Sequence, residues 1–103
     1  MSPPQKFHLR LVTVQPDDVE KWQEFTLHYD LIREAVLTCA AIQADFDIDG
    51  GARYGFTRDG CTRRMYVIDD RTGLPIWAPW MPESQAYKDV RNREERRLMG
   101  LQE

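Results

Sequence analysis

Apolar residues recur in two different rhythms along the first half of the chain. Residues 7–14 (FHLRLVTV) alternate between apolar and polar, which predicts a first β-strand. From Trp22 to Cys39, apolar residues instead recur at spacings of three and four, which is typical of one face of a helix. Asp17 is placed to cap this segment, so the pattern predicts one long amphipathic helix over residues 17–43.

Turn-forming residues divide the middle of the chain into short strands. Residues 52–58 and 62–69 flank an Asp-Gly pair, which tolerates the positive φ angles of a type I′ hairpin turn. Turn residues recur at 70–73, and residues 74–77 then predict a third strand. Two consecutive antiparallel hairpins are therefore expected.

The C-terminal region predicts a second, shorter helix that is rich in charged residues. Pro82 suits the first turn of such a helix, and Gly100 suits its end. The order of elements predicts an α+β fold, in which a small antiparallel β-meander of three to five strands packs against the long helix. A length of 103 residues predicts a single domain over residues 1–103.

Composition narrows the class of protein. The formal net charge of −3 is unevenly spread, because residues 1–50 carry nine acids and four bases whereas residues 51–103 carry eight acids and ten bases. No apolar run approaches the ~20 residues of a membrane span, and the first residues lack a signal-peptide pattern. Only two cysteines are present, Cys39 and Cys61, and both are expected to be free thiols. The chain is therefore predicted to be a soluble cytoplasmic protein.

Candidate catalytic residues are few. The two histidines, His8 and His28, lie far apart in the sequence and lack paired spacing with the cysteines. They are predicted to be surface or structural residues. No catalytic residue and no cofactor are therefore expected, and the protein is predicted not to be an enzyme.

One acidic segment offers an alternative. Asp45, Asp47 and Asp49 precede a glycine in the way that an EF-hand calcium loop begins. The twelfth position of such a loop would be Phe56, where a bidentate Glu is needed. The favoured interpretation is a short edge strand over residues 45–49 with its Asp side chains outward. A small metal-binding protein or enzyme built on this cluster is the alternative.

An aromatic and proline-rich segment follows the predicted third strand. Trp77 and Trp80 lie three residues apart between prolines, so ordering them on binding costs little conformational entropy. The other interpretation is that Trp77 closes the core at the edge of the sheet. The predicted protein interface comprises Trp77, Trp80, Met81 and Arg71.

Arginines are concentrated in the second half of the chain. Six of them are candidates for a basic face toward nucleic acid or an acidic partner: Arg63, Arg64, Arg91, Arg93, Arg96 and Arg97. The acids interspersed with the last four favour a solvated helix face with internal ion pairs instead.

These features together predict a non-catalytic protein-binding module, either an inhibitor or an adaptor. In size and composition the chain is similar to phage-encoded inhibitors of host defence, such as anti-CRISPR proteins, so a phage protein is one version of this prediction. A nucleic-acid-binding protein that uses the arginine face is the alternative. A homodimer through the 17–43 helix is a further expectation, and no membrane partner is expected.

Overall fold

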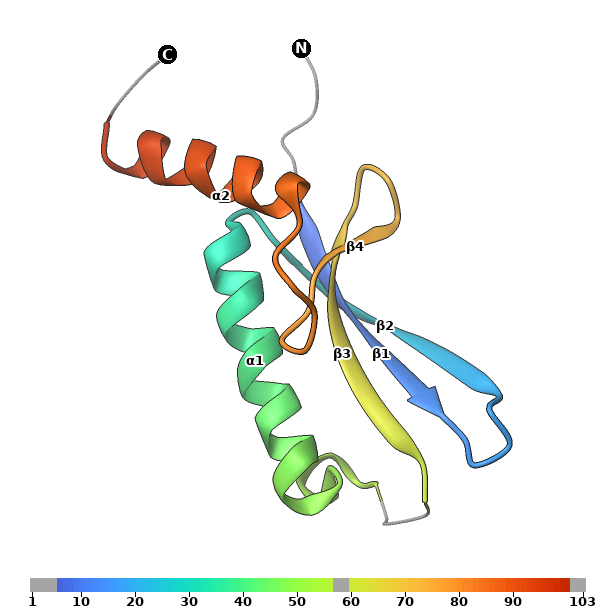
Figure 1. Cartoon of the computed structure of the whole chain (residues 1–103). Coiled ribbons are helices and arrows are strands. Elements are labelled where there is room, and N and C mark those ends of the chain that lie inside the picture. The colour runs from blue at the N-terminus through green and yellow to red at the C-terminus, as the bar shows by residue number, and fades with distance from the viewer. Residues whose placement is uncertain (1–5, 57–59, 101–103) are drawn as a thin grey trace.

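The computed structural model, which describes residues 6–56 and 60–100, shows an α+β fold with a four-stranded antiparallel sheet and two helices (Figure 1). The predicted fold class is confirmed. The strands lie in the order β2-β1-β3-β4, and each neighbouring pair is antiparallel. The elements are β1 (Phe7–Val14), β2 (Glu20–Tyr29), α1 (Ile32–Asp49), the 3₁₀ helix η1 (Ala52–Tyr54), β3 (Thr62–Asp69), β4 (Leu74–Trp77) and α2 (Gln85–Leu98).

The predicted helix over residues 17–43 is wrong, because its first half is strand β2. Only the part from Ile32 onward belongs to α1. Phe25 and Tyr29 pack against the core, whereas Trp22 is 62% exposed on the other face of the strand. The spacing of three and four residues therefore comes from both faces of a strand and not from one face of a helix.

The segment before β2 is a hairpin turn and not the start of a helix. Asp17 accepts a hydrogen bond from the Val19 N–H at 3.3 Å, and Asp18 adopts a positive φ of 66°. The Gln15 N–H donates to the Val19 carbonyl at 2.9 Å and closes the turn between β1 and β2. Of the helix on which the homodimer surface was predicted, only residues 32–43 are helical, as part of α1, and the homodimer itself stays a prediction.

Two further predicted strands are replaced by helical structure. Residues 45–49 continue α1, which places Phe46 in the core and leaves Ile48 74% exposed. Gly50 then ends the helix in the left-handed conformation, and its N–H donates to the Phe46 carbonyl at 2.8 Å. The first residues of the predicted strand over residues 52–58 form η1. Positions 57–59, where that strand was predicted to end and its turn to begin, lie outside the described residues.

Residues 52–58 were predicted to pair with β3, but the strand that pairs with β3 on this side is β1. It pairs with β3 without interruption, from Phe7↔Asp69 to Val14↔Thr62. The predicted strands over 62–69 and 74–77 are confirmed as β3 and β4. The predicted C-terminal helix is α2, but Pro82 lies before it and not in its first turn. The Ser84 hydroxyl caps the helix by accepting from the Tyr87 N–H at 3.1 Å.

The core lies between the helices and one face of the sheet. Strands β1, β3 and β4 contribute Phe7, Leu9, Leu11, Met65, Val67 and Ile76, and the helices contribute Ile32, Ala35, Cys39, Phe46, Tyr87 and Val90.

Two buried polar side chains fix helix α1, one in its second half and one at its N-terminus. Gln43 accepts from the Met65 N–H at 2.7 Å and donates to the Arg63 carbonyl at 3.0 Å, along the part of β3 that β4 does not reach. Glu94 of α2 accepts the N–H groups of Ile32 and Arg33 at 2.6 and 3.1 Å. The two bonds to Glu94 satisfy N–H groups in the first turn of the helix, which have no partner within the helix.

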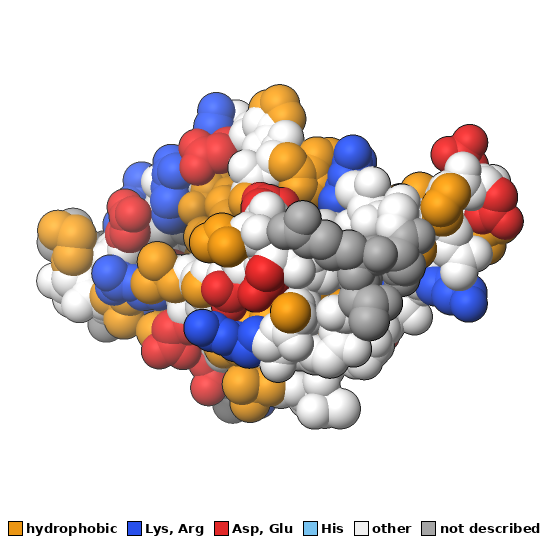
Figure 2. All heavy atoms as spheres, turned by 90° about the horizontal axis from the view of Figure 1, so that it is seen from below, with side chains coloured by type: hydrophobic (Ala, Val, Ile, Leu, Met, Phe, Trp, Pro, Cys, Tyr) orange, Lys and Arg blue, Asp and Glu red, His pale blue; other side chains and the backbone are white. Residues whose placement is uncertain are grey.

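The molecule is elongated, with principal extents of 49 × 25 × 23 Å. The hairpin of β1 and β2 projects to the right in both Figure 1 and Figure 2. Figure 2 shows acidic and basic side chains interspersed on the face seen from below, without a large patch of one sign. Within the described residues, no helix has the length and apolar character to cross a membrane.

Replacing Glu94 by Gln should lower the free energy of unfolding by about 1.5–3 kcal/mol. The change removes a charged acceptor from the positive end of α1 and leaves one buried N–H without a good partner. Urea denaturation measures the difference. Glu95→Gln is the matched control, because Glu95 is exposed and should cost less than about 0.5 kcal/mol. Equal losses in the two variants would show that Glu94 does not cap the helix.

Candidate functional site

The face of the sheet that lies away from the helices collects polar and aromatic side chains. Phe7, Leu9 and Leu11 of β1 point into the core, so the alternate residues of β1 point to the other face. The register of β2, β1 and β3 arranges this outer face in three rows: His28–His8–Ile68, Glu24–Arg10–Tyr66 and Trp22–Val12–Arg64.

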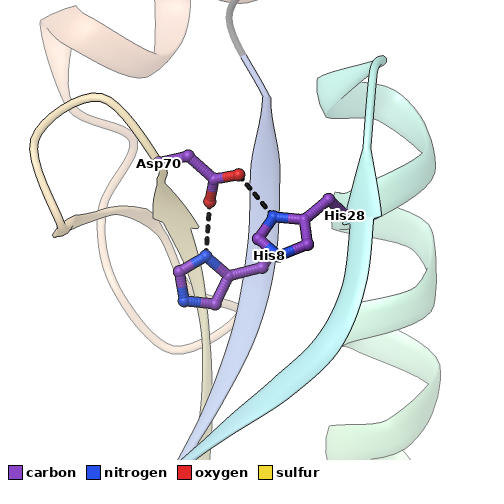
Figure 3. A group of neighbouring side chains, drawn as sticks. All are labelled: His8, His28 and Asp70. Atoms are coloured by element: carbon purple, nitrogen blue, oxygen red, sulfur yellow. Dashed lines mark hydrogen bonds and ion pairs between the residues drawn. The ribbon is translucent and has the colours of Figure 1, made fainter.

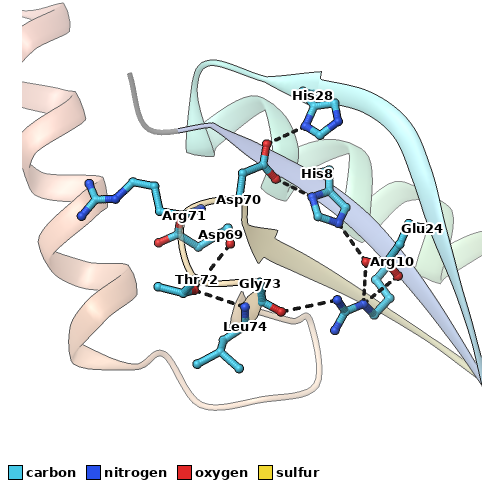
Figure 4. A network of polar contacts seen from close by, with 10 residues as sticks. All are labelled: His8, Arg10, Glu24, His28, Asp69, Asp70, Arg71, Thr72, Gly73 and Leu74. Carbon is cyan, nitrogen blue, oxygen red and sulfur yellow. Dashed lines mark hydrogen bonds and ion pairs between the residues drawn. The ribbon is translucent and has the colours of Figure 1, made fainter. Parts of the chain in front are cut away.

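A chain of charged contacts runs along the outer face from Arg10 to His28 (Figure 4). Arg10 Nε donates to both carboxylate oxygens of Glu24, at 2.7 and 2.8 Å. His8 Nε2 donates to Glu24 Oε1 at 2.9 Å, and His8 Nδ1 contacts one carboxylate oxygen of Asp70. The second oxygen of Asp70 lies 2.5 Å from His28 Nδ1. The network therefore joins β1, β2 and the turn after β3.

The turn between β3 and β4 positions the Asp70 carboxylate. The Asp70 N–H donates to the Lys6 carbonyl at 3.0 Å, which ties the turn to the residue before β1. The buried Asp69 accepts the Arg71 N–H at 3.0 Å and shapes the turn from within. The carboxylate of Asp70 is thus held beside β1 by backbone contacts.

His8 lies between two carboxylates, which favours its charged form. An ionised carboxylate only accepts hydrogen bonds, so both ring nitrogens of His8 donate. Burial lowers the pKa of His8, but its hydrogen bonds to Asp70 and Glu24 outweigh burial, and the pKa lies above its ordinary value of 6.5. Burial likewise raises the pKa of Asp70, but its contacts with the two histidines hold that pKa below the ordinary range. Hydrogen bonds from Arg10 and then from His8 lower the pKa of Glu24.

At the other end of the outer face, two exposed tryptophans each lie under an arginine. Arg10 Cζ is 4.5 Å from the ring centroid of Trp22, and Arg64 Cζ is 4.9 Å from the ring centroid of Trp80. Tyr66 meets Trp80 edge-on, with ring centroids 5.2 Å apart. These five residues are called the tryptophan–arginine surface below.

The predicted protein-interface residues divide between core and surface. Trp77 is half-buried, packs against the core and has its ring centroid 6.2 Å from that of Tyr87. Trp80 is exposed, Met81 is half-buried and Arg71 is exposed in the β3–β4 turn. Of the two predicted tryptophans, Trp80 is therefore the one that is available to a partner.

Asp45, Asp47 and Asp49 lie in the last turns of α1 and not in a loop. Asp45 accepts from the Tyr54 hydroxyl at 2.9 Å, and Asp47 accepts from the Gln43 amide at 3.1 Å. Asp49 accepts backbone N–H groups just beyond the helix. Each carboxylate thus has its own protein partner, and the three do not converge on one point.

The six arginines of the predicted basic face lie in two groups. Arg63 and Arg64 are at the start of β3, at the opposite end of the sheet from α2 (Figure 1). The other four lie on α2, where Arg91 pairs with Glu83 at 3.4 Å and acids are interspersed. The structure does not bring the two groups into one patch.

Both cysteines are free thiols, as predicted. Burial raises the pKa of the Cys39 thiol to about 12, so this residue is protonated and inert at neutral pH. Cys61 is half-buried directly before β3.

His8, His28 and Asp70 form a cluster that the sequence reasoning missed. Their ligand atoms all lie within 4.8 Å of one another, although 62 residues separate His8 from Asp70. Within residues 6–56 and 60–100, no other group of three His, Cys, Asp or Glu side chains converges in this way. A regular hairpin turning at Asp17-Asp18 would place residue 26 opposite His8, and the irregularity in pairing between His8 and Arg10 brings His28 there instead, which no signal in the sequence predicted.

No protein-family model, no curated protein and no solved structure matches this chain in comparisons with known proteins. The function is therefore inferred from the chemistry of the described residues.

Replacing His8 by Gln should remove a contribution to stability that depends on pH. Because the pKa of His8 is raised in the folded protein, its stabilisation is present in full below about pH 6.5 and is lost as the pH rises through the folded-state value. The free energy of unfolding should therefore differ between wild type and His8→Gln by up to about 1 kcal/mol more at pH 6 than at pH 9. Urea denaturation with a chelator present measures this, and a difference independent of pH would contradict it.

Proposed function

We propose that this protein is a non-catalytic protein-binding module, an inhibitor or an adaptor, and that the tryptophan–arginine surface is its binding site. The observation that carries the proposal is the pair of exposed tryptophans, Trp22 at 62% and Trp80 at 45%, each beneath a guanidinium group. Tryptophan and arginine are the residue types most enriched among binding hot spots.

The two tryptophans are spaced for a single partner. Trp22, Val12 and Arg64 occupy one row across three neighbouring strands, about 5 Å apart from strand to strand. The Arg64 guanidinium lies over the Trp80 ring, so Trp80 adjoins this row. Because each tryptophan ring already packs against a neighbour, it loses little conformational entropy when a partner covers it.

The edge of β2 offers a partner a second point of attachment. Strand β2 lies at one edge of the sheet, and each of its residues is exposed or half-exposed. Such an edge presents backbone N–H and C=O groups with which an extended segment can pair. Among the described residues, no carboxylate forms a salt bridge with Arg64. The surface therefore fits a protein partner that supplies an extended segment with apolar and acidic side chains.

Nucleic acid is the alternative partner, since arginines and aromatic rings also stack on bases. Charge favours the protein instead. Glu24 neutralises Arg10, and the chain as a whole carries −3, which repels phosphate. Two free thiols suit a reducing compartment, which supports a cytoplasmic location as part of this proposal. A phage-encoded inhibitor is one version of this role, on the ground of size and composition alone.

Trp22→Ala and Trp80→Ala should each weaken binding of the partner by at least about tenfold. Both side chains are exposed, so the variants should fold. Leu37→Ala is the matched control, because Leu37 is 69% exposed but lies on α1. The partner is captured from the source cell and purified, and its affinity for the four proteins is measured by calorimetry.

Equal affinities of wild type, both tryptophan variants and the control would remove this surface from the proposal. A mobility shift with RNA or DNA that weakens steeply with salt and is lost in Trp22→Ala would favour the nucleic-acid alternative.

A further inference from the structure

Three side chains of the types that bind metals converge at the end of the outer face away from Trp22 (Figure 3). His8 projects from β1, His28 from the neighbouring strand β2, and Asp70 from the turn after β3. Figure 3 shows the rings of both histidines turned with Nδ1 toward the Asp70 carboxylate. All three side chains offer ligand atoms within 4.8 Å of one another.

The spacing of these atoms suits a small ion. Zinc–nitrogen and zinc–oxygen bonds are about 2.0–2.2 Å, which puts neighbouring ligands of a tetrahedral ion roughly 3.3 Å apart. The Asp70 carboxylate lies 2.5 Å from His28 Nδ1, which is a hydrogen-bond distance and shorter than this ligand separation. A bound ion therefore replaces the protons that the histidines share with Asp70, releases them to solvent and moves the side chains slightly apart. The His28 side chain is 49% exposed, so rotations of side chains can admit an ion between the rings and the carboxylate while the strands stay paired.

We propose that His8, His28 and Asp70 bind one divalent transition-metal ion of the zinc class. Two imidazoles and a carboxylate are typical ligands of this class, whereas calcium and magnesium take oxygen ligands almost exclusively. Three protein ligands leave a fourth coordination position on a tetrahedral ion, which water or a donor atom of a partner fills.

Residues behind the cluster hold His8 in the orientation that a metal needs. His8 Nε2 donates to Glu24 at 2.9 Å, and Arg10 in turn holds both oxygens of Glu24. A carboxylate on the far nitrogen is the usual support of a metal-binding histidine, because it fixes the ring and directs the other nitrogen to the ion. The contacts with Glu24 and Arg10 thus hold the ligand in place, which scattered surface ligands lack.

The bound ion would also link separate elements of the sheet. His8 and His28 are paired across β1 and β2, next to the irregularity in pairing between His8 and Arg10. One ion would join the edge strand to the central strand and to the β3–β4 turn. Binding to the folded state alone then raises the melting temperature by mass action.

Calorimetric titration with Zn²⁺ alone tests the proposal. Wild type should bind one Zn²⁺ per chain. His28→Ala and Asp70→Asn should weaken binding by at least ~100-fold, and Glu24→Gln by about 10- to 100-fold. Asp47→Asn, which removes an exposed carboxylate from α1, is the matched control and should bind as wild type does. His28→Ala keeps both cysteines, so it also reports any zinc that the thiols take up.

Circular dichroism establishes first that each variant is folded. Where Asp70→Asn does not fold, His28→Ala and His28→Gln decide the outcome, since the His28 side chain is half exposed. A wild type that binds no Zn²⁺, or a His28→Ala variant that binds it as tightly as wild type, overturns the proposal. Binding that is lost in Asp47→Asn but kept in His28→Ala would place the ion on α1 and would overturn it as well.

Discussion

The attachment of α1 to one face of the sheet is the constraint on which the rest of the structure depends. Gln43, in the second half of the helix, binds the backbone of β3, and Glu94 of α2 caps the helix N-terminus. Both side chains are buried, so moving the helix would leave polar groups without partners at a cost of a few kcal/mol. Both helices therefore contribute to the core on the same face, and the outer face is left to its own side chains.

Neither helix packs on that outer face, so its own side chains shield its apolar residues and pair its charges. Val12 and Ile68 lie on it and are nearly fully buried, so larger side chains of the same face shield them. The His8 and Arg10 side chains are only 13% and 12% exposed, and both contact carboxylates. Charges that are this poorly hydrated need close partners. The contacts among the charged residues follow from this need, and they also leave the two histidines facing one carboxylate.

Local signals were sufficient for β3, β4 and the approximate extent of α2, since the β3–β4 hairpin depends on residues close together in the sequence, such as the turn at 70–73. They were not sufficient for residues 52–54, which form η1, or for the pairing of β3 with the distant strand β1. In the first half, β2 pairs with β1, its neighbour in sequence, and the spacing from Trp22 to Tyr29 imitated a helix because the apolar residues lie on both faces of that strand. That error also hid the candidate site, because His28 faces His8 only in a strand. The sequence left open which of Trp77 and Trp80 is exposed, and the convergence on Asp70 required the register of three elements.

Anomalous X-ray diffraction at the zinc absorption edge tests most directly whether the outer face carries the chemistry of this protein. In crystals grown with one equivalent of Zn²⁺, the strongest anomalous peak should lie between the Nδ1 atoms of His8 and His28 and the carboxylate of Asp70. A strongest peak at Cys61 or at residues 45–49, or a structure with no peak at the histidines, would contradict this assignment.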